Sequence, residues 1–228
     1  MDEIAGLPAR RAALRIADAV LRRGETMERA AGGALQAVRD PADKALARAI
    51  AAETLRWLVD LDALIDSATR QALPDDAKPR AVLRLMLAQW LRLGTPPHAV
   101  IATALPLLSG GPRRLAHGVF SPLTKRASAL PAVPTLPPQV AARWGERAGA
   151  IAAGLAVPPP LDLTLKDAAE TASWAARLGG TSLMPGHVRL ARGAAVEGLE
   201  GFADGAWWVQ DLAASLPCLL YTSPSPRD

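Results

Sequence analysis

Residues 79–93 of this 228-residue chain, PRAVLRLMLAQWLRL, decide its fold class. Pro79 suits the first position of a helix, because proline lacks the N–H that a helix start leaves unpaired. Five large apolar residues then recur at helical spacing: Val82, Leu83, Met86, Trp90 and Leu91. A face this wide must be buried against neighbouring elements. The stretch therefore predicts a helix over residues 80–93 that packs inside a helical protein.

Similar patterns on both sides of this stretch predict six more helices. They cover residues 9–23, 26–38, 40–57, 60–72, 98–108 and 113–127. The clearest start signal is Asp40-Pro41-Ala42-Asp43, with an N-capping Asp, a Pro at the first helical position and an acid in the first turn. Seven short helices with brief connections predict a helical bundle over residues 1–130.

The pattern changes after Leu130. Clustered prolines predict a linker over residues 131–160, which includes a short helical pair over residues 139–155. Residues 161–165, 187–190 and 207–209 have the alternating pattern of strands, and residues 170–178 have that of a helix. Residues 161–217 are therefore expected to form a small, incomplete α+β domain.

The last eleven residues, Cys218–Asp228, resemble the translation of a sequencing adapter. We therefore interpret residues 218–228 as a non-native tail and expect the natural chain to be interrupted at about Pro217. The alternative is a natural flexible tail rich in Ser and Pro.

Composition limits the function without fixing it. The chain has 26 Lys and Arg against 22 Asp and Glu, a net charge of +4, and most of the cations are Arg. Such a surplus permits nucleic-acid binding, although solvated Arg on helix faces would give the same composition. The lone Cys218 excludes a disulfide framework and a cysteine-based zinc site. Because the start lacks the features of a signal peptide and residues 148–161 are too short and broken to span a membrane, we expect a cytoplasmic protein without a membrane partner.

A search for catalytic groups gives negative results. His98, His117 and His187 lie far apart in the sequence and lack neighbours at ligand spacing, so no metal site is expected. The sequence contains no nucleophile elbow, phosphate loop or dinucleotide-binding glycine pattern. Four acids are interpreted as surface residues of helices: Glu53, Asp60, Asp62 and Asp66. Four tryptophans are expected to pack in cores: Trp57, Trp90, Trp144 and Trp174.

Three basic pairs are the candidate binding residues. Arg10-Arg11 opens the first predicted helix, Arg113-Arg114 opens the seventh, and Lys125-Arg126 closes it. Arginines beside the free N–H groups of a helix start predict phosphate contacts. Lys125-Arg126 is a weaker candidate, because cations at the end of a helix also favour the helix dipole. Solvated charge is the alternative for all three pairs.

Several segments together resemble one family. They are Pro8–Ile16, Asp43–Arg48, Leu55–Trp57, Arg84–Gln89, Thr95–Ala99 and Trp207–Asp211. In order and spacing they resemble the front of the Sun/RsmB group of 16S rRNA (cytosine-C5) methyltransferases, over nearly all of residues 7–217. The resemblance implies a mainly α fold, with a NusB-like, RNA-binding helical bundle followed by the small α+β domain, which helps to hold RNA beside the catalytic domain.

The same resemblance implies that catalysis lies elsewhere. In the family, the segment like Trp208–Asp211 leads into an S-adenosylmethionine-binding domain, which has a glycine loop and two cysteines that this sequence lacks. We therefore expect a chain with no cofactor or catalytic residue of its own, acting as a monomer on small-subunit ribosomal RNA through Arg10, Arg11, Arg113, Arg114, Lys125 and Arg126. Residues 117–123 depart from the family pattern, and Pro122 is expected to kink the seventh helix. A stand-alone NusB-type antitermination factor and a helical protein–protein module remain alternatives.

Overall fold

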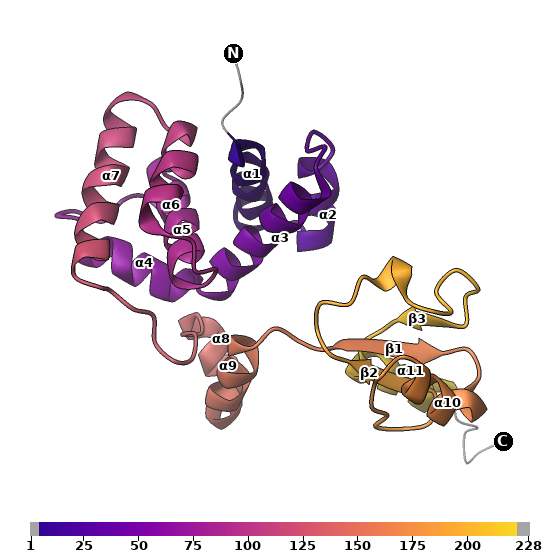
Figure 1. The fold of residues 1–228 in the computed structure, drawn as a ribbon. Helices are drawn as coiled ribbons and strands as arrows, with labels where there is room; N and C mark the ends of the chain where they lie inside the picture. The colour runs from indigo at the N-terminus through magenta and orange to yellow at the C-terminus, as the bar shows by residue number, and fades with distance from the viewer. Residues whose placement is uncertain (1–4, 223–228) are drawn as a thin grey trace. The chain divides into compact units, whose positions relative to one another are not determined.

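The computed structural model describes residues 5–222, with side chains from residue 5 to residue 217. The chain forms two units, Met1–Ala156 and Val157–Asp228. In its described part, the first unit is entirely helical (Figure 1). Its elements are α1 Leu7–Arg23, α2 Met27–Ala34, α3 Pro41–Arg56, α4 Leu58–Ser67, α5 Lys78–Leu91, α6 Pro97–Ala104, η1 Leu105–Leu107, α7 Gly110–Lys125, α8 Pro138–Trp144, η2 Gly145–Arg147 and α9 Ala148–Ala156. The seven predicted bundle helices and the helical pair are confirmed.

Local chemistry explains where several helices begin and end. The Asp40 side chain accepts a hydrogen bond from Ala42 N and caps α3, and Thr26 accepts one from Arg29 N and caps α2. Helix α6 ends four residues earlier than predicted and continues as a 3₁₀ turn that contains Pro106, which has no N–H for the α-helical ladder. Pro122 lies inside α7 without ending it.

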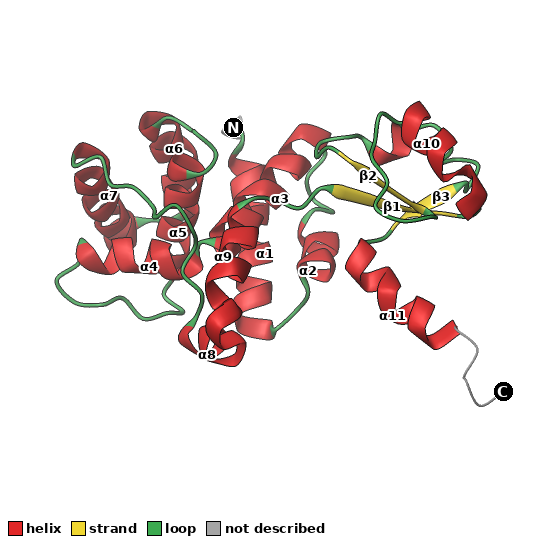
Figure 2. Ribbon diagram, turned by 90° about the horizontal axis from the view of Figure 1, so that it is seen from below, coloured by secondary structure: helices red, strands yellow, loops and turns green. Residues whose placement is uncertain are grey.

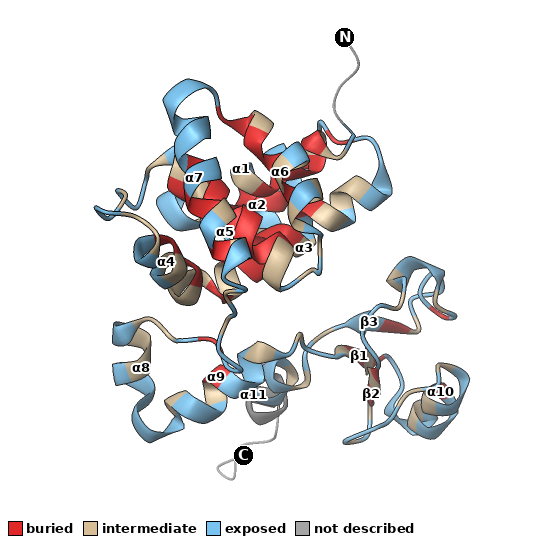
Figure 3. Ribbon diagram, turned by 60° about the vertical axis from the view of Figure 1, so that its left-hand side comes forward, coloured by how far each residue is buried: buried red, intermediate tan, exposed pale blue. Residues whose placement is uncertain are grey.

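Helix α5 is buried on every side (Figure 3). Val82, Leu83, Met86, Leu87 and Ala88 join one core cluster, with residues of α4, α6 and α7. Leu85 joins a second cluster, with α1, α2 and α3. A helix that is buried all round has no face left for polar side chains, yet α5 also buries Arg80, Arg84 and Gln89.

Carboxylates of α4 neutralise the buried arginines of α5. Asp62 accepts hydrogen bonds from Arg84 Nε and Nη2 at 2.7 and 2.8 Å, and from Arg80 Nε at 3.0 Å. Asp66 accepts two more from Arg80, at 2.7 and 2.9 Å, and these bonds lower the pKa of Asp66 below its usual value. The prediction that Asp62 is an ordinary surface acid is therefore wrong, because its carboxylate pairs with the buried guanidiniums of Arg80 and Arg84.

Glu53 and Asp60 also have structural roles. Glu53 is buried and forms ion pairs with Arg56 and Arg92, so its assignment to the surface is wrong too. Asp60 accepts hydrogen bonds from the backbone N and hydroxyl of Thr135, at 2.8 and 2.6 Å. This contact fixes the segment between α7 and α8 to α4.

The second unit is a three-stranded sheet with small helices (Figure 2). Its elements are β1 Leu161–Leu165, η3 Ala168–Glu170, α10 Thr171–Arg177, β2 His187–Leu190, η4 Val196–Gly198, β3 Trp207–Val209 and α11 Leu212–Thr222. The strand order is β2-β1-β3, and β1 is antiparallel to both neighbours. The three predicted strands are confirmed, and a mainly α fold with a small α+β part is observed.

The second unit has a core of its own. It consists of Leu163, Leu165, Trp174, Val188, Leu190 and Trp207. Gly201 is buried below it with φ +85°, and a Cβ there would lie 2.5 Å from the Trp174 ring, so only glycine fits. Trp57 and Trp174 are buried as predicted, but Trp144 is 46% exposed, and its assignment to a core is wrong. Helix α8 buries none of its residues, which explains the exposure of Trp144.

Two predictions stay open. The predicted boundaries at residues 130, 160 and 217 are not tested by the division into two units. Residues 218–228, the predicted non-native tail, have side chains that lie outside the described part of the structure. Residues 223–228 lie outside the described backbone as well.

The Asp62 network gives a first testable prediction. Asp62→Asn removes the charge that two buried arginines share, and we expect it to lower the free energy of unfolding by about 3 kcal/mol. Asp76→Asn, which changes a 70% exposed side chain 3.9 Å from Arg22, is the matched control and should change it by less than about 0.5 kcal/mol. Urea unfolding followed by circular dichroism measures both, and equal effects would contradict the role of Asp62.

Candidate nucleic-acid interface

The charge of the chain is divided unequally between the two units. Residues 1–156 hold 21 of the 26 cations and 14 of the 22 acids, a net charge of +7. Residues 157–228 hold the other 5 cations and 8 acids, a net charge of −3. The whole basic surplus therefore belongs to the helical unit, and a net positive charge of this kind favours contact with a polyanion.

Arg10 faces the interior of the bundle. It is only 7% exposed, its Nε donates to Gln89 Oε1 at 2.8 Å, and its Nη1 donates to Gly6 O at 3.2 Å. Gln89 in turn donates to Leu85 O. Burial lowers the pKa of Arg10, and the charge of Asp43 opposes this shift. The guanidinium therefore joins the start of α1 to α5, and Arg10 does not belong to the exposed basic surface.

The other three predicted arginines near helix starts are exposed. They are Arg11 in α1, and Arg113 and Arg114 in α7. Neither helix has an acid in its first turn or a side-chain cap at its N-terminus. Both helices contact η1, and Figure 1 shows them starting at the same end of the bundle. The structure therefore brings Arg11, Arg113 and Arg114 to one end, where free backbone N–H groups also lie.

Arg15, which belongs to no basic pair in the sequence, lies near the middle of α1. Arg15 is exposed one helical turn after Arg11, so the two side chains lie on the same face of α1. A groove between α1 and α2 is lined by Arg15, Arg23 and Arg29, together with Asp18 and Glu25. In the sequence, the i, i+4 spacing of Arg11 and Arg15 indicates this shared face, whereas adjacency of cations does not.

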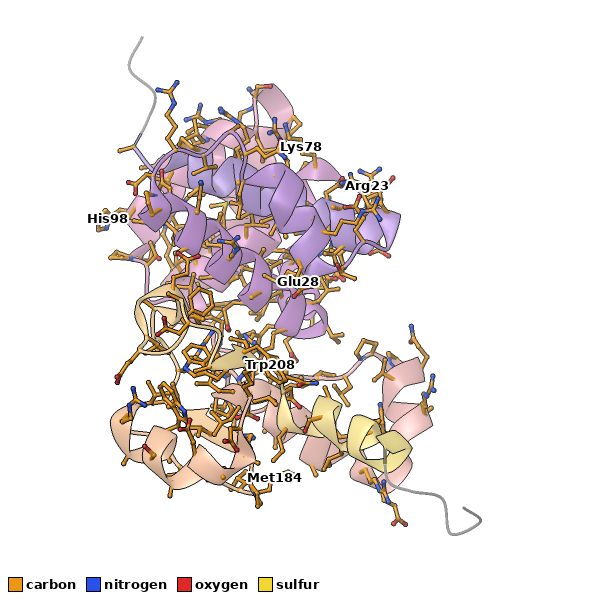
Figure 4. The ribbon with its side chains drawn as sticks, turned by 90° about the vertical axis from the view of Figure 1, so that its right-hand side faces the viewer. Arg23, Glu28, Lys78, His98, Met184 and Trp208 are labelled. Atoms are coloured by element: carbon orange, nitrogen blue, oxygen red, sulfur yellow. The ribbon has the colours of Figure 1, made fainter. Side chains whose placement is uncertain are left out.

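The charges in this groove are only partly compensated. Arg23 pairs with Glu25 at 2.7 Å and with Asp18 at 3.6 Å, and Figure 4 shows its side chain at the surface of the helical unit. Neither Arg15 nor Arg29 forms an ion pair within the described part of the chain.

Four exposed arginines of α1 and α7 are the candidate phosphate contacts, and we call them the α1–α7 cations: Arg11, Arg15, Arg113 and Arg114.

Lys125 and Arg126 lie at the other end of α7. Lys125 follows Arg113 by twelve residue steps of helix, a distance of about 18 Å along the axis. The Arg126 guanidinium donates to Ser67 Oγ at 2.6 Å and to Ser128 Oγ at 3.0 Å, which fixes the end of α7 to the end of α4. The third basic pair is therefore not part of the same surface. Contact with RNA by any of the six predicted residues stays a prediction.

The second unit is organised around one buried acid, Asp162 in β1. It is 4% exposed and accepts two hydrogen bonds from Arg189, both at 2.7 Å, and one from Leu212 N at 3.1 Å. His187 Nε2 lies 3.4 Å from Asp162 Oδ1. The Arg189 hydrogen bonds, assisted by the Leu212 N–H and the nearby charges, lower the pKa of Asp162 to about 2. Asp162 thus joins β1, β2 and the start of α11, a role that the alternating pattern did not indicate.

The described residues contain no helix long and apolar enough to cross a membrane. In the same part of the chain, no three His, Cys, Asp or Glu side chains are grouped to hold a metal ion.

Comparison with known proteins identifies the class of the helical unit. Residues 7–109 match the NusB family, so the helical unit holds a NusB-like domain. Over 92% of its length, the chain is 31% identical to the ribosomal RNA small subunit methyltransferase B of Xanthomonas campestris pv. campestris. The chain spans about half of that relative, 52% of its length.

Solved structures with a related fold are more distant. A likeness to the crystal structure of PH0851 covers 96% of this chain and 56% of that one, with a TM-score of 0.56 at 12% identity. This likeness extends over both units and concerns the fold alone. A chain in the crystal structure of antitermination factors NusB and NusE in complex with dsRNA is 18% identical over 54% of this chain and 99% of that one, with a TM-score of 0.48.

The Asp162 contacts predict how the second unit responds to acid. Because the pKa is lowered from about 4 in the unfolded chain to about 2 in the fold, the stabilisation is complete above about pH 4 and is lost as the pH falls toward 2. We expect a loss of about 2 kcal/mol over this interval. Urea unfolding near pH 5.5 and near pH 2.5, followed by the indole N–H signal of Trp207, measures it.

Two variants separate Asp162 from the other acids. Asp162→Asn should be less stable near pH 5.5 and should lose about 2 kcal/mol less than the natural chain on acidification. Asp204→Asn changes an exposed acid of the same unit and should keep the full acid response. If Asp162→Asn kept it as well, Asp162 would not be its source.

Proposed function

We propose that this chain is the RNA-binding front region of an rRNA (cytosine-C5) methyltransferase. The observation that carries the proposal is the extent of the likeness to methyltransferase B: it covers 92% of the chain, whereas the NusB family match ends at residue 109. The similarity to the enzyme therefore includes the α+β unit, for which an antitermination factor consisting of the NusB domain alone has no counterpart.

In this proposal the helical unit holds RNA by its phosphates. The α1–α7 cations are all arginines, and a guanidinium can contact a phosphate with two parallel hydrogen bonds. The N–H groups at the starts of α1 and α7 offer further donors to an anion. The net charge of +7 on this unit attracts the polyanion from a distance, and the negative second unit does not. Contacts of this kind position RNA without reading its sequence.

We further propose that methyl transfer takes place in a part of the enzyme outside this sequence. That part would bind S-adenosylmethionine and supply the cysteine nucleophile. The enzyme would act in the cytoplasm, as a monomer, on small-subunit ribosomal RNA. The genomic DNA beyond codon 217 in an intact copy of the gene tests this proposal. The absence of an in-frame methyltransferase domain there would leave the stand-alone NusB-type factor as the better assignment.

The RNA surface gives a prediction about salt. We expect binding to a small-subunit rRNA hairpin to weaken steeply between about 50 and 200 mM salt, since each neutralised phosphate releases counterions. Arg113→Ala/Arg114→Ala should bind roughly ten-fold less tightly at low salt and reduce the log–log slope by about two. Arg11→Ala/Arg15→Ala should behave alike. Fluorescence anisotropy with a labelled hairpin measures these affinities.

The matched control is Arg143→Ala/Arg147→Ala, which removes two exposed arginines of the α8–η2 segment in the same unit. It should leave the slope nearly unchanged. Binding that is insensitive to salt, or equal slopes for all three double variants, would reject the α1–α7 surface. Salt-insensitive or absent RNA binding would favour a protein–protein module.

A further inference from the structure

A groove in the second unit is not used by the proposed phosphate contacts. It is lined by residues of all three strands and of α11, including Thr164, His187, Trp208, Gln210 and Ser215, with Met184 and Pro185 beside them. Figure 4 shows Trp208 and Met184, which both border it.

The strand register explains why these side chains meet. Thr164 of β1 is paired with His187 of β2 and with Trp208 of β3. The three residues therefore form one row across the sheet, on the face opposite to that of Leu163 and Trp207 in the core. Polar and aromatic groups share this row, and the core face is apolar.

His187 forms part of the wall of this groove. It is 2% exposed, and its Nδ1 accepts a hydrogen bond from Leu183 N at 3.4 Å. Its Nε2 is also buried, lies 3.4 Å from Asp162 Oδ1 and makes no hydrogen bond to the described residues. The ring nitrogens of His187 therefore face the protein, and the residue supplies ring surface to the groove.

Trp208 provides a flat surface in the same row. The residue is 48% exposed, and its Nε1 donates to Gln210 Oε1 at 2.9 Å, which holds the indole in one orientation. Neither the Gln210 amide nitrogen nor the Thr164 hydroxyl forms a hydrogen bond within the described part of the chain. The groove therefore combines an ordered aromatic face with groups that can bind the edge of a planar ring.

Charge decides which ligand fits. Among residues 157–217, no Lys, Arg, Asp or Glu lines the groove, and the second unit as a whole carries −3. A row of phosphates is therefore disfavoured, whereas a neutral ring with donors and acceptors on its edge matches the lining. An extended peptide would need free backbone groups along a strand edge, but the available groups here are side chains on the face of the sheet.

We infer that this groove binds one unpaired nucleobase of RNA. The base stacks on the Trp208 indole, and its edge contacts the Thr164 hydroxyl and the Gln210 amide. Stacking on an aromatic side chain combined with hydrogen bonds to the base edge is how single-stranded RNA is recognised by proteins. The inference rests on the proposed RNA-binding function and adds a base contact to the phosphate contacts of the helical unit.

The test uses the full chain labelled with ¹⁵N at its tryptophan indoles. The probes are oligouridine and oligoadenosine of about ten nucleotides, and an abasic ribose-phosphate chain of equal length. The indole N–H signal of Trp208 should shift with at least one of the two base-containing probes and stay in place with the abasic chain. Trp208→Ala should weaken binding of that probe by about ten-fold while leaving the salt dependence unchanged.

Further variants guard against misfolding and indirect effects. Trp208→Phe keeps an aromatic face and should retain most of the affinity. Thr164→Val keeps the side-chain volume and should weaken binding several-fold without removing the shift of the Trp208 signal. Trp144→Ala, which removes a similarly exposed indole from α8, is the matched control and should bind as the natural chain does.

The outcomes separate this inference from the proposed function. If no probe and no rRNA hairpin binds, both fail. If RNA binds with the expected salt dependence but the Trp208 signal is unmoved and Trp208→Ala binds normally, the base site alone is overturned.

Discussion

The complete burial of α5 is the constraint on which the helical unit depends. Its apolar residues divide between two core clusters, so the helices on both sides of the bundle pack against a single segment. Its three buried polar residues must find partners inside the protein, because water cannot reach them. Asp62 and Asp66 of α4 satisfy the two arginines, and Arg10 of α1 satisfies Gln89. The positions of α1 and α4 are thus fixed by polar contacts as well as by packing.

Periodicity predicted the elements well, because spacing along a helix or strand is a local property. The apolar pattern of residues 79–93, the capping signal at Asp40 and the alternation at 161–165 each correspond to an observed element. The partners of polar residues were not predictable in this way. Arg10 and Gln89 are 79 positions apart, and Asp162 and Arg189 are 27 apart, so neither pairing can be predicted from local spacing.

The candidate site, too, depends on long-range packing that local spacing does not predict. Adjacent cations were the signal used in the sequence, and it selected Arg10, whose guanidinium faces the core, while it missed Arg15, which is exposed. Both lie in α1, and only the packing of that helix against α3 and α5 decides which arginines face outward. The groove around Trp208 was equally hidden, because its lining depends on the register of three strands. Trp207 and Trp208 lie on opposite faces of β3, as the alternation of a strand requires.

The contact between Asp60 and Thr135 has a consequence for the reach of the α8–α9 pair. Twelve residues separate the end of α7 from the start of α8, enough for a long excursion if they were unattached. The carboxylate of Asp60 holds Thr135, which leaves only Leu136 and Pro137 before α8 begins. Three residue steps span about 10 Å at most, so the first turn of α8 is confined to a small volume next to α4. The Asp60 carboxylate thus shortens the unattached connection before α8 to two residues. The segment between α7 and α8 loses the conformational entropy that it would keep without this contact.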